Sequence, residues 1–111
     1  MKLSEMSSSL GYTAVQDQFQ DRDIQHGYTS DLLSDVMANA AEGSVLITIQ
    51  AHKNAVAVAS MAGIAAIVIC NSRPIPDDML ETARSECIAV FTTPKNQFTV
   101  SAEVYNRLQA E

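Results

Sequence analysis

Basic, amide and hydroxyl side chains follow three short apolar segments of this chain, where they could bind an anion. The segments cover residues 45–49, 65–70 and 88–91. The residues concerned are His52, Lys53 and Asn54 after the first segment, Asn71, Ser72 and Arg73 after the second, and Thr93 and Lys95 after the third. Ammonium and guanidinium groups donate charge-assisted hydrogen bonds to phosphate and carboxylate oxygens, and amides and hydroxyls add further bonds. The sequence therefore predicts a site for a small anionic metabolite, such as a nucleotide or another phosphate-bearing compound.

The apolar segments are the elements that must position these residues. Each is continuous and rich in β-branched side chains, which is typical of a strand covered on both faces in a parallel sheet. The spacers 50–64 and 71–87 are long enough for crossover connections, and they contain helix patterns over 55–62 and 76–87. Parallel strands end at one edge of a sheet, where loops meet the N-termini of helices. The polar residues should therefore lie together at that edge; the alternative is that they only solvate their loops.

Weaker patterns flank this core. Helices are expected at 3–10, 32–40 and 96–109, and strands at 12–15 and 23–28, which could pair as an antiparallel hairpin at the sheet edge. The predicted fold class is α/β, with three α/β/α layers around a mainly parallel central sheet. With 111 residues and no linker-like stretch, the chain is expected to form a single domain over residues 1–111.

Two local predictions concern helix caps and burial. Ser30 or Asp31 is expected to cap helix 32–40, and Asn54 to cap helix 55–62. Helix 55–62 is apolar all round and should be deeply packed.

Charge and hydropathy argue against several classes of partner. Seven Lys and Arg against thirteen Asp and Glu give a net charge of −6, so nonspecific nucleic-acid binding is not expected. The longest weakly polar stretch, 55–70, is shorter than the ~20 residues of a membrane span, and residues 1–11 lack the apolar core of a signal peptide. We therefore expect a cytoplasmic protein that makes no contact with a membrane. Cys70 and Cys87 lie in apolar runs without metal-binding spacing and are expected to be buried free thiols.

No catalytic motif is complete. The chain lacks the phosphate loop G-x-x-x-x-G-K-[ST], the dinucleotide fingerprint G-x-G-x-x-G and the nucleophile elbow G-x-S-x-G. Carboxylates gather near the front of the chain, at Asp17, Asp21, Asp23, Asp31 and Asp35. Helix capping and solvation account for them better than a magnesium site does. No metal, cofactor or catalytic residue is predicted.

The chain resembles a known family, the DRTGG domains, which are similar to the N-terminal domain of HPr kinase/phosphorylase. The resemblance rests on residues 27–38, which read GYTSDLLSDVMA, together with 45–50, VLITIQ, and 52–59, HKNAVAVA. Its most specific part is Ser30 to Met37. The likeness covers nearly the whole chain, from the first helix through Thr92-Thr93-Pro94 to the last helix.

The resemblance implies a three-layer α/β/α domain that acts in regulation or assembly, often pairs with itself and is not a kinase. Members of the family accompany catalytic or regulatory domains, including CBS-pair and phosphotransacetylase proteins, and a small stand-alone form exists. Where the Asp-Arg and Gly-Gly of the family's name would fall, this chain has His52-Lys53 and Asn71-Ser72. Because asparagine and serine restrict a backbone that glycine leaves permissive, a phosphate cradle of bare amides is less expected at that turn.

The sequence leaves three hypotheses about function. The first is a non-catalytic cytoplasmic regulatory or assembly module that forms a homodimer, modulates a protein partner encoded nearby, and senses a small anionic metabolite. The second is a small enzyme that uses His52 as a base, with Lys53 or Arg73 stabilising an anion. The third is a purely structural dimerisation domain without a ligand. The absence of catalytic motifs, together with the resemblance, favours the first.

Overall fold

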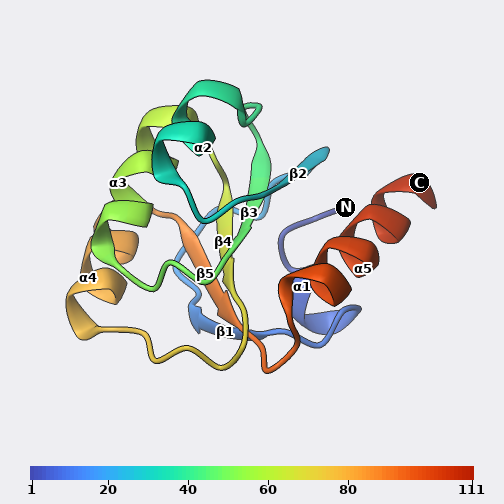
Figure 1. The fold of residues 1–111 in the computed structure, drawn as a ribbon. Helices are drawn as coiled ribbons and strands as arrows, with labels where there is room; N and C mark the ends of the chain where they lie inside the picture. The colour runs from blue at the N-terminus through green and yellow to red at the C-terminus, as the bar shows by residue number, and fades with distance from the viewer.

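A five-stranded sheet forms the centre of the computed structural model, which describes residues 1–111 (Figure 1). In spatial order, the strands are β1 (Thr13–Gln16), β5 (Ala89–Thr92), β4 (Ala66–Ile69), β3 (Ser44–Thr48) and β2 (His26–Thr29). Strands β2 to β5 run parallel, and β1 is antiparallel to β5. The predicted α/β class with a mainly parallel sheet is therefore confirmed.

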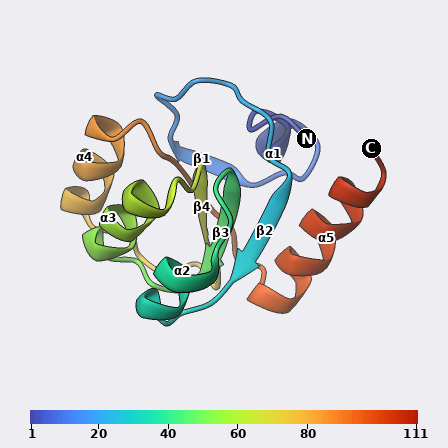
Figure 2. The ribbon, with the colours of Figure 1, turned by 90° about the horizontal axis from the view of Figure 1, so that it is seen from above.

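Helices cover both faces of the sheet, as the view from above shows (Figure 2). One layer holds α1 (Glu5–Ser8) and α5 (Gln97–Gln109), and the other holds α2 (Leu33–Asn39), α3 (Lys53–Ala62) and α4 (Asp77–Ser85). Successive side chains of a strand point to opposite faces, so β3 contributes Val45 and Ile47 to the core under α5 and Leu46 to the core under α3. None of the helices has both the length and the apolar character that crossing a lipid bilayer requires.

The two outer strands do not form the predicted hairpin. Strands β1 and β2 lie at opposite edges of the sheet, where β1 pairs with β5 and β2 pairs with β3. A hairpin needs a tight turn of about two to five residues, and the polar spacer between these strands is longer. Part of that spacer pairs with the N-terminal segment instead, since the Ile24 amide donates to the Met1 carbonyl oxygen at 2.7 Å.

Helix α3 is less deeply packed than predicted. Its buried side chains are Ala55, Val56 and Ala59, whereas Ala57 is exposed and Met61 is 75% exposed. The helix lies in the same layer as α2 and α4, so its neighbours and the sheet cover only its inner side (Figure 2). An apolar face of this helix therefore stays in contact with solvent.

The predicted caps are also different in the structure. The Asn54 amide donates to Nδ1 of His52 at 3.0 Å, so His52 rather than Asn54 caps α3. Helix α2 begins after Leu32 without a side-chain cap, so neither Ser30 nor Asp31 has the predicted role. The Ser30 hydroxyl accepts the Leu32 amide at 3.2 Å, and the Asp31 carboxylate accepts bonds from Thr48 and Ile49. The cap of α3 thus engages a ring nitrogen of His52, a residue that the sequence analysis assigned to the ligand site.

Cys87 is exposed, contrary to the prediction that both thiols are buried, and it sits in a strained turn. Its φ is 56°, and it follows the end of α4, where the Ile88 amide donates to Ala83 and the Cys87 amide to Arg84. These two bonds define a Schellman turn, whose left-handed position favours glycine. Cys70 is buried, as predicted.

We expect Cys87→Gly to raise the free energy of unfolding by about 1 kcal/mol, because glycine removes the cost of a Cβ in the left-handed region. Urea denaturation measures this change. Cys87→Ala is the matched control, because alanine removes the thiol but keeps the Cβ, and it should give no gain. Equal stability of the glycine and alanine variants would contradict the strain at this position.

Candidate ligand-binding site

The predicted site residues follow the carboxyl ends of β3, β4 and β5, in loops except for Lys53 and Asn54, which begin α3. We call this edge the rim and define it as residues 52–54, 71–73 and 93–95. The second and third rim loops are joined, since the Asn71 amide donates to the Lys95 carbonyl oxygen at 2.9 Å and the Ser72 amide to Thr93 at 3.0 Å. The rim loops after β4 and β5 therefore form one hydrogen-bonded unit.

The backbone of the middle rim loop is left-handed at two successive residues. Asn71 has φ 61° and Ser72 has φ 51°, values that glycine adopts without a steric cost. All three amides of this loop have acceptors inside the protein, because the Arg73 amide donates to the Cys70 carbonyl oxygen at 3.3 Å. A ligand at this loop must therefore be bound by side chains rather than by bare amides.

The three cations of the rim differ in their partners. Lys95 Nζ donates to Glu103 Oε2 at 2.7 Å and lies 5.8 Å from the centre of the Tyr12 ring. Lys53 Nζ is 4.0 Å from Asp78 Oδ2, which is a weak, exposed contact. Arg73 forms no ion pair and is exposed. Arg73 is therefore the cation most available to an anion.

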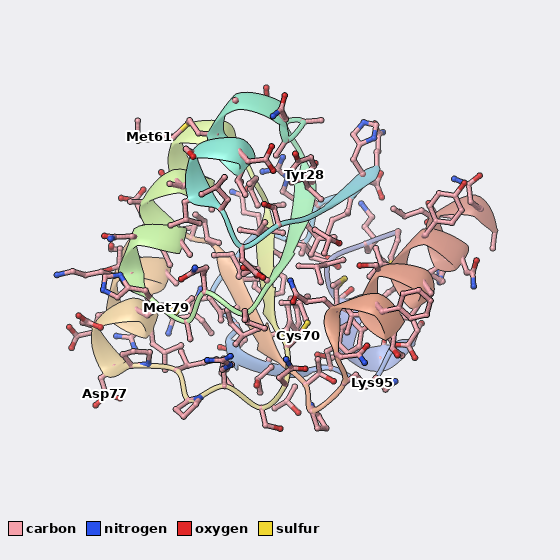
Figure 3. The ribbon with its side chains drawn as sticks, viewed as in Figure 1. Tyr28, Met61, Cys70, Asp77, Met79 and Lys95 are labelled. Carbon is pink, nitrogen blue, oxygen red and sulfur yellow. The ribbon has the colours of Figure 1, made fainter.

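The rim cations share an edge but do not meet at one point. Lys53 begins α3 on one face of the sheet, and Lys95 precedes α5 on the other. Figure 3 labels Lys95 at one end of the lower edge and Asp77, the first residue of α4, at the other end. The Lys53 ammonium lies 4.0 Å from the carboxylate of the next residue, Asp78. The loop with Arg73 follows the strand between β3 and β5. A compound that contacts all three cations must therefore be extended along the rim.

The other rim residues mostly hold the loops in place. The Thr93 side chain is buried, and its hydroxyl accepts a hydrogen bond from the Lys95 amide at 3.2 Å. His52 uses Nδ1 to accept the Asn54 amide. Of the predicted set, the exposed side chains of Lys53, Asn54, Asn71, Ser72 and Arg73 extend outward from the rim.

Tyr12, Lys95 and Glu103 form a connected group beside the rim. The Tyr12 hydroxyl donates to Glu103 Oε1 at 2.7 Å, and burial of the ring raises the pKa of Tyr12 far above its ordinary range. The hydrogen bond from Lys95 is the main cause that lowers the pKa of Glu103, and the bond from Tyr12 adds to it. Glu103 is therefore a carboxylate held by two donors.

We expect Glu103→Gln to lower the free energy of unfolding by about 1 kcal/mol at about pH 7, and by less in acid. Because the pKa of Glu103 is lower in the folded protein than its ordinary 4.5, its contribution is complete above that value and is lost as the pH falls through the folded pKa. Urea denaturation at several pH values measures the difference. Glu81→Gln, an exposed change on α4, is the control. If the difference in unfolding free energy between the wild-type chain and Glu103→Gln does not vary with pH, Glu103 is not a carboxylate stabilised by Lys95 and Tyr12.

Asp31 is a component of this region that the sequence analysis assigned to another role. Its Oδ1 accepts hydrogen bonds from the Thr48 hydroxyl at 2.9 Å, the Ile49 amide at 3.0 Å and the Gln97 side chain at 2.9 Å. The Asp31 carbonyl oxygen accepts another bond from Gln50 at 2.9 Å. One carboxylate thus joins the turn after β2, the end of β3 and the start of α5. Recognising β2 as a parallel strand would have placed Asp31 at this edge.

Three of the four remaining carboxylates of the acidic group have separate partners, and that of Asp23 is Lys2, with 3.8 Å between Oδ1 and Nζ. Asp21 accepts from the amide and hydroxyl of Ser4, and Asp35 accepts from the Tyr28 hydroxyl at 2.8 Å. No three His, Cys, Asp or Glu side chains lie close enough together to hold a metal ion.

Burial is the main cause that raises the pKa of the Cys70 thiol, to about 11, so this thiol is protonated at neutral pH.

Comparisons with known proteins place this arrangement among related folds. A model of the DRTGG domain family matches residues 17–107. A similar solved structure contains the CBS and DRTGG domains of the regulatory region of Clostridium perfringens pyrophosphatase, complexed with the activator diadenosine tetraphosphate. The TM-score is 0.70 at 17% sequence identity, over 90% of this chain and 44% of that chain. This chain thus spans less than half of that structure, and at this identity the likeness concerns the fold alone. No curated protein matches the chain.

Proposed function

The chain belongs to the DRTGG domain family, and we propose that residues 1–111 act as a single, non-catalytic regulatory domain. In this proposal the domain self-associates, modulates a protein partner and senses a small phosphate-bearing metabolite at the rim. The observation that carries the proposal is Arg73, an exposed cation without an ion-pair partner, which lies between the loops of Lys53 and Lys95.

The chemistry of the rim favours an extended anion over a compact one. Its cations are distributed along the edge on both faces of the sheet, so linked phosphates would contact more of them than one phosphate would. The regulatory region of the clostridial pyrophosphatase, which contains a DRTGG domain, binds diadenosine tetraphosphate as an activator. This supports nucleotides with several phosphates as the first compounds to test.

The geometry does not favour the alternative in which His52 acts as a base. A neutral imidazole has one accepting nitrogen, and in His52 this nitrogen already accepts the Asn54 amide. The other nitrogen then carries the proton and can only donate. A catalytic cycle based on His52 would have to break the cap of α3 at each turnover, so we retain the regulatory proposal.

Isothermal titration calorimetry tests the sensing function. Diadenosine tetraphosphate, ATP and inorganic phosphate are titrated into the protein, and we expect saturable binding of at least one nucleotide and weaker binding of phosphate. No heat of binding at about 1 mM of either nucleotide would contradict sensing of this class of compound, because such affinities are too weak to sense a metabolite. A purely structural dimerisation domain would be the remaining hypothesis.

A further inference from the structure

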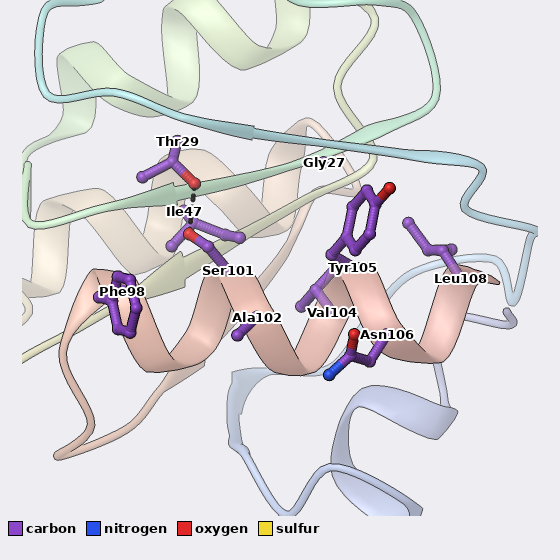
Figure 4. Close-up of a pocket in the computed structure, with 10 residues that line it drawn as sticks. All are labelled: Gly27, Thr29, Ile47, Phe98, Ser101, Ala102, Val104, Tyr105, Asn106 and Leu108. Carbon is purple, nitrogen blue, oxygen red and sulfur yellow. Dashed lines mark hydrogen bonds between the residues drawn. The ribbon is translucent and has the colours of Figure 1, made fainter. Parts of the chain in front are cut away.

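An apolar groove runs between the outer strand β2 and helix α5 (Figure 4). Its volume is about 430 Å³, and its walls include Gly27, Thr29 and Ile47 from the sheet and Phe98, Ser101 and Tyr105 from α5. The two aromatic rings lie largely in solvent, with Phe98 83% exposed and Tyr105 62% exposed. They lie two turns apart on one side of α5, and apolar residues at this spacing are typical of a helix face that packs against another element.

The groove borders a strand edge with unpaired backbone groups. Strand β2 has β3 on one side and no strand on the other. The Ser30 amide donates to Ile47, so Tyr28 also points its backbone groups toward β3, and Gly27 and Thr29 point theirs outward. The opposite edge strand, β1, has an irregular register between Ala14 and Gln16, which discourages pairing with another strand. Strand β2 is therefore the open, regular edge of this sheet.

We propose that this edge and groove bind a second copy of the chain through antiparallel pairing of the two β2 strands. This inference rests on the self-association included in the proposed function and specifies its surface. A two-fold axis beside Tyr28 would place Gly27 opposite Thr29 of the second copy, and Thr29 opposite its Gly27. Both residues direct their N–H and C=O groups outward, so each pair exchanges two hydrogen bonds. The two sheets then form one continuous sheet, with both α5 helices on the same face.

Three observations favour a second copy as the occupant. The pattern of outward groups on β2 is self-complementary, because the two outward residues flank Tyr28 symmetrically. None of the residues that line the groove is charged, although the chain carries a net charge of −6, so the groove itself adds no like-charge contact between two copies. Phe98 is 83% exposed and Tyr105 62% exposed. With about 200 Å² of surface for an aromatic residue, burying both in each of two copies would supply about half of the ~1,200 Å² of a small stable interface.

Glycine at position 27 leaves the floor of the groove open. A Cβ there would lie 3.6 Å from Val104 and 3.7 Å from Val45, so any larger side chain would extend into the groove. Thr29, in contrast, is exposed and ends at a hydroxyl that contacts the Ser101 hydroxyl at 2.6 Å. A long charged side chain at position 29 therefore reaches the proposed interface without disturbing the buried core.

Sedimentation equilibrium tests the interface with Thr29→Lys and its matched control Thr13→Lys, an exposed change on the opposite edge strand. We expect the wild-type chain to dimerise, Thr29→Lys to raise the dimer dissociation constant about 100-fold or more, and Thr13→Lys to leave it unchanged, since two like charges across an interface cost several kcal/mol. Phe98→Ala, a second change in the groove, should also weaken the dimer. Thermal unfolding of each monomer verifies that the variants are folded.

Disulfide trapping locates the axis. In Tyr28→Cys/Cys87→Ser, the two introduced thiols would stand at a non-hydrogen-bonded pair with Cα atoms about 4.5 Å apart, which permits a disulfide. We expect a covalent dimer on mild oxidation. If the wild-type chain dimerises but Thr29→Lys does not weaken the dimer and Tyr28→Cys does not form a disulfide across it, this interface is overturned. Self-association through another surface would then remain. A chain that stays monomeric up to about 1 mM would overturn both, whereas calorimetry of the rim would be unaffected.

Discussion

Asp31→Ala is expected to lower the free energy of unfolding by about 3 kcal/mol, because it leaves three hydrogen-bond donors without their acceptor. These donors are the Thr48 hydroxyl, the Ile49 amide and the Gln97 side chain, which come from the end of β3 and the start of α5. Thr48 is fully buried, so water cannot replace the carboxylate there. Urea denaturation followed by circular dichroism measures the change.

Asp31→Asn is the matched control for this prediction. Asparagine keeps one acceptor oxygen at the same position, so we expect a loss of about 1 kcal/mol. Equal losses for the two variants would mean that the negative charge of Asp31 matters rather than its accepting geometry. A loss below about 1 kcal/mol for alanine would contradict the role of Asp31 as a structural connection at the rim.

The second large effect concerns the ligand. The double variant Lys53→Ala/Arg73→Ala should weaken nucleotide binding about 100-fold or more, because each of the two lost charge-assisted hydrogen bonds contributes about 1.5–3 kcal/mol. Both side chains are exposed, so the stability of the fold should change little. Calorimetry with the nucleotide that binds the wild-type chain measures the loss of affinity.

Arg84→Ala provides the control for charge. Arg84 is exposed in the last turn of α4, the helix whose other end lies at the rim, and it forms no ion pair. This variant changes the net charge as each single rim variant does but should keep the wild-type affinity. An equal loss of affinity for Arg84→Ala and Arg73→Ala would indicate attraction by overall charge and would contradict a site at the rim.

The buried part of the fold could be predicted from local pattern, and its outer strands could not. The predicted strands 45–49, 65–70 and 88–91 correspond to β3, β4 and β5 within one residue at each end, because a continuous apolar run has few alternatives to a central strand. Strand β2 is mostly exposed, and its residues carry no comparable signal. Contacts between residues distant in the sequence decide which strand pairs with β2, and local periodicity does not report such contacts.

The candidate site shows the same division. Strand ends could be placed, and with them the rim residues, because parallel strands end at a common edge. The contact between Tyr12 and Glu103 joins residues from opposite ends of the chain, and the amides of Asn71 and Ser72 bond to a neighbouring loop. Such tertiary bonds determine which rim groups are already engaged, and a single sequence does not reveal them.

The central claim is that a phosphate-bearing metabolite binds at the rim, and amide chemical-shift mapping during a titration tests it most directly. With diadenosine tetraphosphate as the probe, we expect the shifts to concentrate at the amides of residues 52–54 and 71–73 and of Thr93 and Lys95, since Pro94 has no amide N–H. The amides of Gly27 and Ser101, which line the groove between β2 and α5, should change little. Shifts centred on that groove, or no shifts at about 1 mM of the compound, would contradict the claim.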